Sequence, residues 1–331
     1  MRVIFVLLLF HLNYFLPAQT EKGQLTETEQ FVFYGHYWMN MHHFFMEEAL
    51  LRLHGNHSIL PKAAMKQMDN FEVQRIENTV EYYMENLSDE DLQTSDYMKA
   101  FKSWIITQDQ HALKGIPAQF KTHCFNLIQA SLTYRTYLWD DHQKTLNDIL
   151  GKNLELIKMT EIPVINQLEK LTQGHWQEEK IRVDLCFTGI NSEEKGQITP
   201  YNTLNPTQVV MTSNVAESPK GNWLEVLYQQ AGGNLISPAS GEVSNTISEV
   251  SAEMLINSPK DLWLAYWYYF TGEAVKQVLA KNGVENYAPS IVRNEPFTEC
   301  YSTLDKYLPL YISGKKTLHA VTKKIVKKVN R

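Results

Sequence analysis

Apolar residues recur every three or four positions through most of the first half of the chain, and this spacing predicts helices. The helical stretches are residues 28–54, 64–86, 91–106, 116–149 and 150–173. Breaks are expected at Leu60-Pro61 and at Gly115-Ile-Pro117, because proline ends helices and glycine marks turns.

The pattern changes after residue 180. Residues 181–187 alternate apolar and polar positions, which indicates a half-buried strand, and residues 207–212 form a second short strand candidate. The polar stretch 188–203 between them contains Gly189, Gly196 and Pro200, so a loop or a hairpin is expected there.

Two further helices are predicted. The first begins at Asn222, a good N-cap, with Glu225 in a capping-box-like position three residues later. Gly232 and Gly233 each cost about 1 kcal/mol relative to alanine inside a helix, so packing has to hold this helix or it ends there. The second is expected to start with Ser258 as its cap and to run centrally through the fold to Lys281.

These elements predict a mainly α fold with a small β-sheet, in the α+β class. A helical part at residues 20–180 and a second part at 181–331, which holds the sheet and the later helices, are expected to form one compact unit. A hydrophobic fraction of 44% with 11% aromatic residues is enough for a large core, and a net charge of -6 gives no indication of nucleic-acid binding.

The N-terminal residues 1–19 read as a signal peptide. A basic Arg2, an apolar stretch over residues 3–16 and a small residue at Ala18 are typical of export to the periplasm or the extracellular space. An uncleaved N-terminal anchor is the alternative, and no stable membrane span is expected after cleavage. Three widely spaced cysteines, Cys124, Cys186 and Cys300, leave at least one free thiol and leave the pairing of the others open.

The C-terminal residues 315–331 are basic and amphipathic. Lysines occupy one helical side and apolar residues the other; the lysines are Lys323, Lys324, Lys327 and Lys328. A docked helix with a solvated lysine face is the favoured interpretation, and contact with an acidic membrane surface is the alternative.

The helix that begins at Asn222 has the frame of a zinc-hydrolase helix without its ligands. In the pattern H-E-x-x-H, two histidines four residues apart bind zinc and the glutamate acts as general base. Here the five positions are Gln229, Gln230, Ala231, Gly232 and Gly233. An amide is a poor zinc ligand, glycine is no ligand, and Gln230 cannot accept a proton as a base does.

Five segments, in order, are similar to a family of secreted bacterial proteins regarded as zinc metallopeptidases. Residues 224–236 (LEVLYQQAGGNLI) resemble that family's LEVLFHEASHAL. The other similar segments are residues 40–45 (NMHHFF), 134–142 (YRTYLWDDH), 201–207 (YNTLNPT) and 262–273 (LWLAYWYYFTGE). The resemblance spans roughly residues 31 to 328 and implies a thermolysin-like organisation, with Glu273 as an orphaned third-ligand position.

A polar stripe accompanies this motif. His36, Asn40, His43 and Glu47 fall on one face of a predicted helix. A hydrogen-bonded core histidine pair is a more common reason for such a stripe than metal binding, although the resemblance places it beside the former active site.

Further candidates for the same cleft come from other segments. Arg135 and His142 form a possible second wall, which an amphipathic surface explains equally well. Tyr201 precedes the second strand, and Tyr228 with Gln229 and Gln230 belongs to the motif helix. Tyr287 and Arg293 are candidates by family position only.

The favoured function is therefore that of a non-catalytic, metallopeptidase-like secreted protein, a pseudoenzyme. Its cleft is expected to bind a peptide, a protein or a small ligand, without a cofactor. The alternative is a residual zinc-dependent hydrolase whose metal site was rebuilt from His36, His43, Glu47 and Glu273. The sequence identifies neither the ligand nor the oligomeric state.

Overall fold

The computed structural model describes residues 23–188, 201–203, 207–212, 221–236, 241–292 and 295–330. It is mostly helical with one small sheet, which confirms the α+β class. The predicted signal peptide and Arg293 lie outside the described residues, as does much of the loop predicted at 188–203.

The sheet contains five strands in the order β1-β2-β3-β5-β4. They are β1 (Gln24–Glu27), β2 (Phe31–Tyr34), β3 (Ile181–Cys186), β4 (Tyr201–Thr203) and β5 (Gln208–Thr212). β2, β3 and β5 run parallel to one another, and β1 and β4 flank them antiparallel. The carboxyl ends of the three central strands therefore meet at one edge of the sheet.

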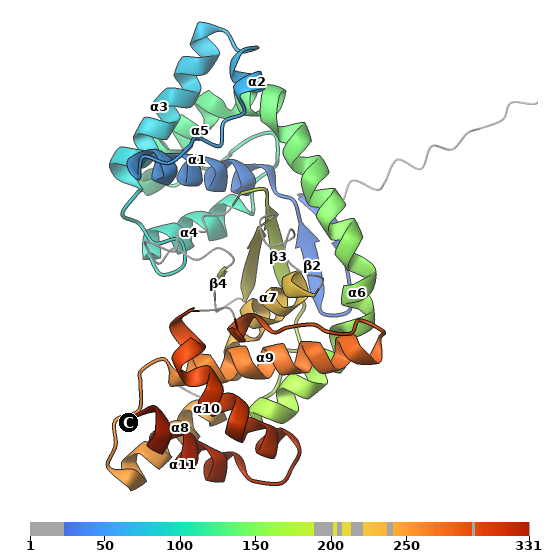
Figure 1. Cartoon of the computed structure of the whole chain (residues 1–331). Helices are drawn as coiled ribbons and strands as arrows, with labels where there is room; N and C mark the ends of the chain where they lie inside the picture. The colour runs from blue at the N-terminus through green and yellow to red at the C-terminus, as the bar shows by residue number, and fades with distance from the viewer. Residues whose placement is uncertain are drawn as a thin grey trace, which may run out of the picture.

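Five helices cover this edge and one face of the sheet, drawn in blue and cyan to green in Figure 1. They are α1 (Tyr37–Leu53), α2 (Lys62–Met65), α3 (Asn70–Asn86), α4 (Asp96–Ile105) and α5 (Lys121–Tyr134). Their apolar side chains form one core with Cys186 and Val210, which the sheet contributes from this face.

The opposite face of the sheet packs on a second and larger core. After a five-residue π-helical turn, Arg135–Trp139, the long helix α6 (Asp140–Thr172) runs along the molecule and returns the chain to β3. Helix α7 (Asn222–Ala231) and a 3-10 turn (Gly232–Ile236) lie on this face. The remaining helices are α8 (Glu242–Met254), α9 (Leu262–Lys281), α10 (Glu295–Ile312) and α11 (Leu318–Val329).

Several sequence-based boundaries were wrong. The helix predicted from residue 28 begins at Tyr37, because residues 31–34 form β2, whose Phe31 and Phe33 are buried against the second core. The helical stretches predicted at 116–149 and 150–173 meet within one continuous helix, α6. Ser258 is not a helix cap, since α9 starts at Leu262 after the N-cap Asp261.

The boundary expected near residue 180 separates elements that pack on each other. β2 pairs with β3 across it, and Glu161 of α6 accepts hydrogen bonds from Thr28 Oγ1 at 2.7 Å and Gln30 N at 2.6 Å. Within the described residues, no helix is both long and apolar enough to cross a membrane.

Candidate functional site

The polar stripe of α1 lies at the carboxyl ends of the parallel strands. The Asn40 side chain donates to Leu185 O at 2.9 Å and accepts from Phe187 N at 2.8 Å, so it pairs with the end of β3 as a neighbouring strand would. It also donates to His36 O at 3.1 Å, one turn back along its own helix. Asn40 therefore attaches α1 to the edge of the sheet where ligands usually bind in such folds.

The two histidines of the stripe are buried. His36 lies 3.1 Å from the carbonyl oxygen of Gln108, and His43 is only 2% exposed. Burial, together with the nearby Lys102 ammonium, lowers the pKa of His43 to about 3. His43 is therefore neutral at physiological pH.

Glu47 completes the stripe and is the group with the most unusual environment. It is 8% exposed, and its Oε2 has no hydrogen-bond partner among the described residues. Its pKa is raised to about 7, mainly by burial and also by the Glu48 carboxylate, while the nearby Thr188 hydroxyl lowers it in part. Near neutral pH this carboxyl group is therefore present in both protonation states.

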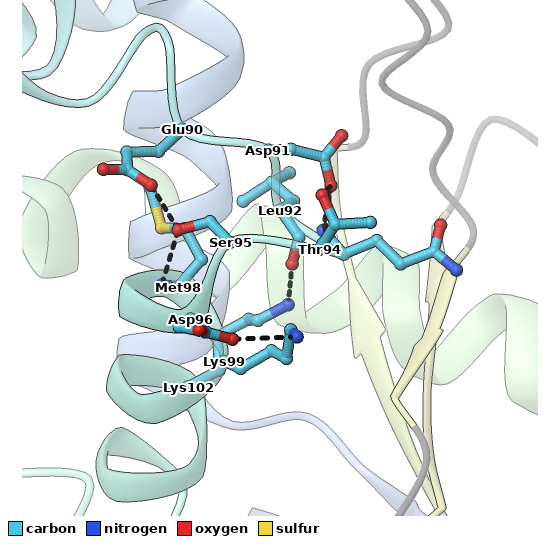
Figure 2. A network of polar contacts seen from close by, with 10 residues as sticks. Glu90, Asp91, Leu92, Thr94, Ser95, Asp96, Met98, Lys99 and Lys102 are labelled. Atoms are coloured by element: carbon cyan, nitrogen blue, oxygen red, sulfur yellow. Dashed lines mark hydrogen bonds and ion pairs between the residues drawn. The ribbon is translucent and has the colours of Figure 1, made fainter.

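Lys102, on α4, is a functional candidate that the sequence did not reveal. It is 1% exposed and its ammonium donates to the carbonyl oxygen of Leu92, as Figure 2 shows. Burial lowers its pKa to about 7, and the Cys186, Asp91 and Asp184 side chains partly offset this shift. On an amphipathic helix a lysine is normally solvated, so the chain carries no local signal for this position.

The loop that covers Lys102 is ordered by its own side chains. The Asp91 carboxylate accepts from Gln93 N at 2.9 Å and from Thr94 N at 2.6 Å, and Ser95 caps α4 through Met98 N (Figure 2). This loop therefore holds the Leu92 carbonyl oxygen in place for the lysine.

A second group of rings lies behind the stripe. The Tyr83 hydroxyl lies 2.9 Å from His42 Nδ1 and 2.7 Å from His123 Nε2, and His123 Nδ1 lies 3.2 Å from the Tyr97 hydroxyl. Burial lowers the pKa of both histidines. These hydrogen bonds satisfy Tyr83 and both ring nitrogens of His123 inside the core, whereas His42 Nε2 has no hydrogen-bond partner among the described residues.

Arg135 and His142, which were predicted to form a second wall of the cleft, lie in two different places. The His142 ring stacks on Phe187 with centroids 3.7 Å apart, so it joins the residue whose backbone Asn40 holds. Arg135 instead donates to Gln110 O at 2.8 Å and lies over the Tyr37 ring at 4.3 Å. His142 therefore borders the stripe, whereas Arg135 fastens a surface loop.

The motif helix α7 starts differently from the expectation. Its N-cap is Gly221, with φ of 100°, and Asn222 is its first helical residue. Glu225 does not form a capping box. Its buried carboxylate accepts from the Tyr287 hydroxyl, from Ser290 N at 2.9 Å and from Ser290 Oγ at 2.6 Å.

Gln229 belongs to the same network. Its Nε2 donates to Glu225 Oε1 at 2.9 Å and to Ser290 Oγ at 3.0 Å. Gln229 is only 5% exposed. Helix α9 approaches closely here, since a Cβ on Gly272 would lie 3.2 Å from Glu225 Oε1. The position of the first expected zinc ligand is thus a packed hydrogen-bonding position.

The rest of the motif is also enclosed or displaced. Helix α7 ends at Ala231, and Gly233 lies in the following 3-10 turn. A Cβ on Gly232 would lie 2.5 Å from Trp267 and 3.0 Å from Trp176. Gln230 is partly buried, and the structure describes only the backbone of Tyr201, which pairs with Val210 in the sheet.

The α7 motif and the α1 stripe lie at opposite ends of the sheet. Tyr228, fully buried, packs on Phe31 with centroids 5.9 Å apart, and Trp223 packs near Phe33 at 6.4 Å. Helix α7 therefore runs antiparallel to β2, and Gln229 lies towards the amino ends of the strands. The structure does not bring the two groups of predicted cleft residues together.

Glu273 is paired within its own helix. Trp267 Nε1 donates to Gln229 O at 2.9 Å, which connects α9 to α7. Glu273 directly follows Gly272, the residue at which α9 approaches the Glu225 carboxylate. It pairs with Lys276 at 3.1 Å. The residues present on α7 and α9 do not fit a zinc site.

Comparisons with protein-family models, with curated proteins and with solved structures found no match. Within the described residues, no group of three or more histidine, cysteine, aspartate or glutamate side chains has the spacing to hold a metal ion.

The close packing at Gly232 is testable by substitution. Gly232→Ala is expected to lower the free energy of unfolding by about 1–3 kcal/mol, because the new methyl group overlaps Trp267 and Trp176. Urea denaturation measures the change. Gly151→Ala in α6 is the control, since nothing lies near its Cβ, and about 1 kcal/mol of stabilisation is expected there. Similar effects in both variants would contradict the packing described for α7.

Glu47→Gln tests the environment of the stripe. An unfolded glutamate has its pKa near 4.5 and the folded one near 7, so the folded chain retains a proton that the unfolded chain releases between these values. Wild-type stability therefore falls as pH rises through this window, by about 2–3 kcal/mol, whereas a glutamine contributes no such loss.

The measurement is the difference in unfolding free energy between Glu47→Gln and the wild type at several pH values. This difference is expected to grow in favour of the variant from about pH 5 to about pH 8. Glu81→Gln, at an exposed position on α3, is the control and should show no such growth. A pH-independent difference for Glu47→Gln would show that the carboxyl group is solvated.

Proposed function

We propose that this chain is a non-catalytic, metallopeptidase-like binding protein of thermolysin-like organisation. The order β3, β5, α7 and α9, with Glu273 late in α9, supports this ancestry together with the resemblance of five segments. The observation that carries the non-catalytic assignment is the hydrogen bonding of Gln229 to Glu225 and Ser290. A catalytic zinc helix needs ligand side chains directed at an open position that water can occupy.

On α7 the corresponding side chains are directed into packed protein. Glu225 and Gln229 connect α7 to the segment that holds Tyr287 and Ser290, and Trp267 connects it to α9. A buried carboxylate is tolerated only when donors surround it, and Glu225 has donors from three residues. This network supports a structural role for α7 in place of a catalytic one.

The ligand site that the proposal assigns is the stripe at the carboxyl ends of the strands. Glu47 Oε2 and Thr212 Oγ1 are buried and have no hydrogen-bond partner among the described residues. Thr212 is the register partner of Cys186, which lies in the core under α1. Buried polar atoms of this kind are usually satisfied by a ligand, water or protein group, and a peptide N–H suits the Glu47 carboxylate.

The alternative, a hydrolase with a rebuilt metal site, has less support. Of its four components, His36 lies at the Gln108 carbonyl oxygen and Glu273 pairs with Lys276, whereas only His43 and Glu47 belong to the interior part of the stripe. Two ligands are fewer than the three that catalytic zinc sites use.

Zinc titration of the purified chain tests the proposal. Calorimetry is expected to show no zinc binding near one equivalent, and casein hydrolysis should equal the background with and without a chelator. About one zinc per chain with chelator-sensitive hydrolysis would refute the proposal. In that case Gln229→Ala and His43→Ala, assayed side by side, would show whether the metal lies on α7 or on α1.

Export is a separate part of the proposal, based on the apolar residues 3–16 and on Ala18. N-terminal sequencing of the native protein is expected to find a start shortly after Ala18. A protein that starts at Met1 and fractionates with membranes would show an anchor in place of a signal peptide.

A further inference from the structure

Leu255 has a backbone conformation and an exposure that are both unfavourable for leucine. Its φ is 54°, in the left-handed region, and its side chain is 94% exposed. It directly follows α8, where Leu255 N donates to Ala252 O at 3.2 Å and Ile256 N to Ser251 O at 3.0 Å. Glycine or asparagine normally occupies this position of a helix end, because a β-carbon is strained there.

Neither the strain nor the exposure contributes to the stability of the fold. Of the three non-glycine residues with positive φ in the described part of the chain, Gln173 and Asn286 are polar. Leu255 alone among them presents a large apolar side chain to solvent. The unusual feature is therefore the combination, in one residue, of a left-handed backbone and an almost fully exposed apolar side chain.

Helix α11 packs beside α8 and carries the basic residues of the C-terminal segment (Figure 1). Its buried face, Leu318, Val321, Ile325 and Val326, confirms the predicted docked helix. Its other face is exposed and lysine-rich. No acidic residue follows Asp305 in the sequence, so every charged residue in 306–331 is basic, in a protein whose net charge is -6.

The lysines of this face repel one another. The Lys324 ammonium lies beside Lys316 and lowers its pKa, and Lys324 and Lys306 both lie near the Tyr307 ring, at 5.8 and 5.5 Å. Glu253 of α8 pairs with His319 and with Lys323, at 3.0 and 3.3 Å. Lys306, Lys316 and Lys324 form no ion pair with a carboxylate among the described residues.

Leu255 lies two residues after Glu253, which pairs with Lys323 of α11. We propose that Leu255 and the neighbouring lysines of α10 and α11, Lys306, Lys316, Lys324, Lys327 and Lys328, form one surface that docks on an anionic phospholipid membrane. The lysines bind the headgroup phosphates, and the Leu255 side chain enters the boundary between headgroups and acyl chains. Tyr307, among the lysines, is of the residue type that favours this boundary. A nucleic acid or another hydrated polyanion would bind the lysines, but it would make no favourable contact with an exposed leucine.

This inference is independent of the ligand site proposed on α1. That site lies among α1–α5 at one end of the molecule, and α8, α10 and α11 lie at the other (Figure 1). A membrane-docked chain would therefore keep its ligand site directed away from the lipid surface.

Co-sedimentation with vesicles tests the docking surface. The chain is expected to bind phosphatidylcholine vesicles that contain phosphatidylglycerol at least tenfold more tightly than vesicles of phosphatidylcholine alone, and rising salt should weaken the binding. Lys324→Gln with Lys327→Gln is expected to weaken it about 30-fold, at roughly 1 kcal/mol for each lysine. The N-terminal segment is the same in every variant, so differences between variants report this surface.

Leu255→Ser is expected to weaken vesicle binding about tenfold. Its matched control is Leu132→Ser on α5, where the leucine is 63% exposed, and less than about twofold change is expected there. Leu255→Gly provides a second readout, because it should weaken binding in the same way while it raises the urea midpoint of unfolding.

Equal binding to neutral and anionic vesicles, or no binding to either, would overturn the proposal. If Leu255→Ser leaves vesicle binding unchanged while the lysine variant loses it, and heparin binds equally well, the surface is a general polyanion site and the membrane assignment is wrong.

Discussion

The position of α1 depends on the amide side chain of Asn40. Parallel strands end with backbone groups that need partners, and the end of β3 obtains two of them from this one side chain, at Leu185 O and Phe187 N. The same amide reaches back to His36 O, so the first turn of the helix and the last residues of the strand form one unit. His43 and Glu47 follow on the same helix, and their burial results from this attachment.

The positions of α7 that resemble a zinc motif have a structural role. Helix α7 packs between the sheet and α9, and the packing relies on Glu225, Gln229, Gly232 and Gly272. Gly272 lets α9 approach the Glu225 carboxylate, and Gly232 leaves room for two tryptophan rings. Larger residues at these places would separate the helices, so the positions that look degenerate in the sequence have a physical role in the structure. Gly232, which directly follows the last residue of α7, permits the close contact with the two tryptophan rings.

The sequence predicted the elements whose pattern is local and failed where distant residues decide. The alternation in residues 181–187 predicted β3, and the amphipathic C-terminus predicted α11. β2 was missed because Phe31-Val-Phe-Tyr34 continues the apolar spacing of the helix behind it, and only its pairing with β3 makes it a strand.

The sequence likewise predicted only part of the candidate site on α1 and α7. The spacing of His36, Asn40, His43 and Glu47 correctly placed the last three on one helix, whereas His36 is the extended residue that precedes its first turn. Lys102 was not found, because its burial depends on how the preceding loop at residues 90–95 folds over it and on β3, which is distant in sequence. Glu225 was interpreted as a cap, since its partners Tyr287 and Ser290 follow more than sixty residues later.

Leu255 connects stability and function in this fold. A glycine there would remove the strain of the left-handed backbone, and a polar residue would remove the exposed apolar surface, so a fold under selection for stability alone has two simple ways to improve. Both improvements would leave the lysines of α11 without an apolar contact, and exposed lysines alone bind weakly once salt screens them. Attachment by charge and by one inserted side chain is reversible, because each contribution is small and neither resembles a membrane-spanning segment. We therefore interpret the strained backbone of Leu255 as a loss of stability that the proposed membrane-binding surface requires. The other contacts of α8 keep the helix folded despite this loss.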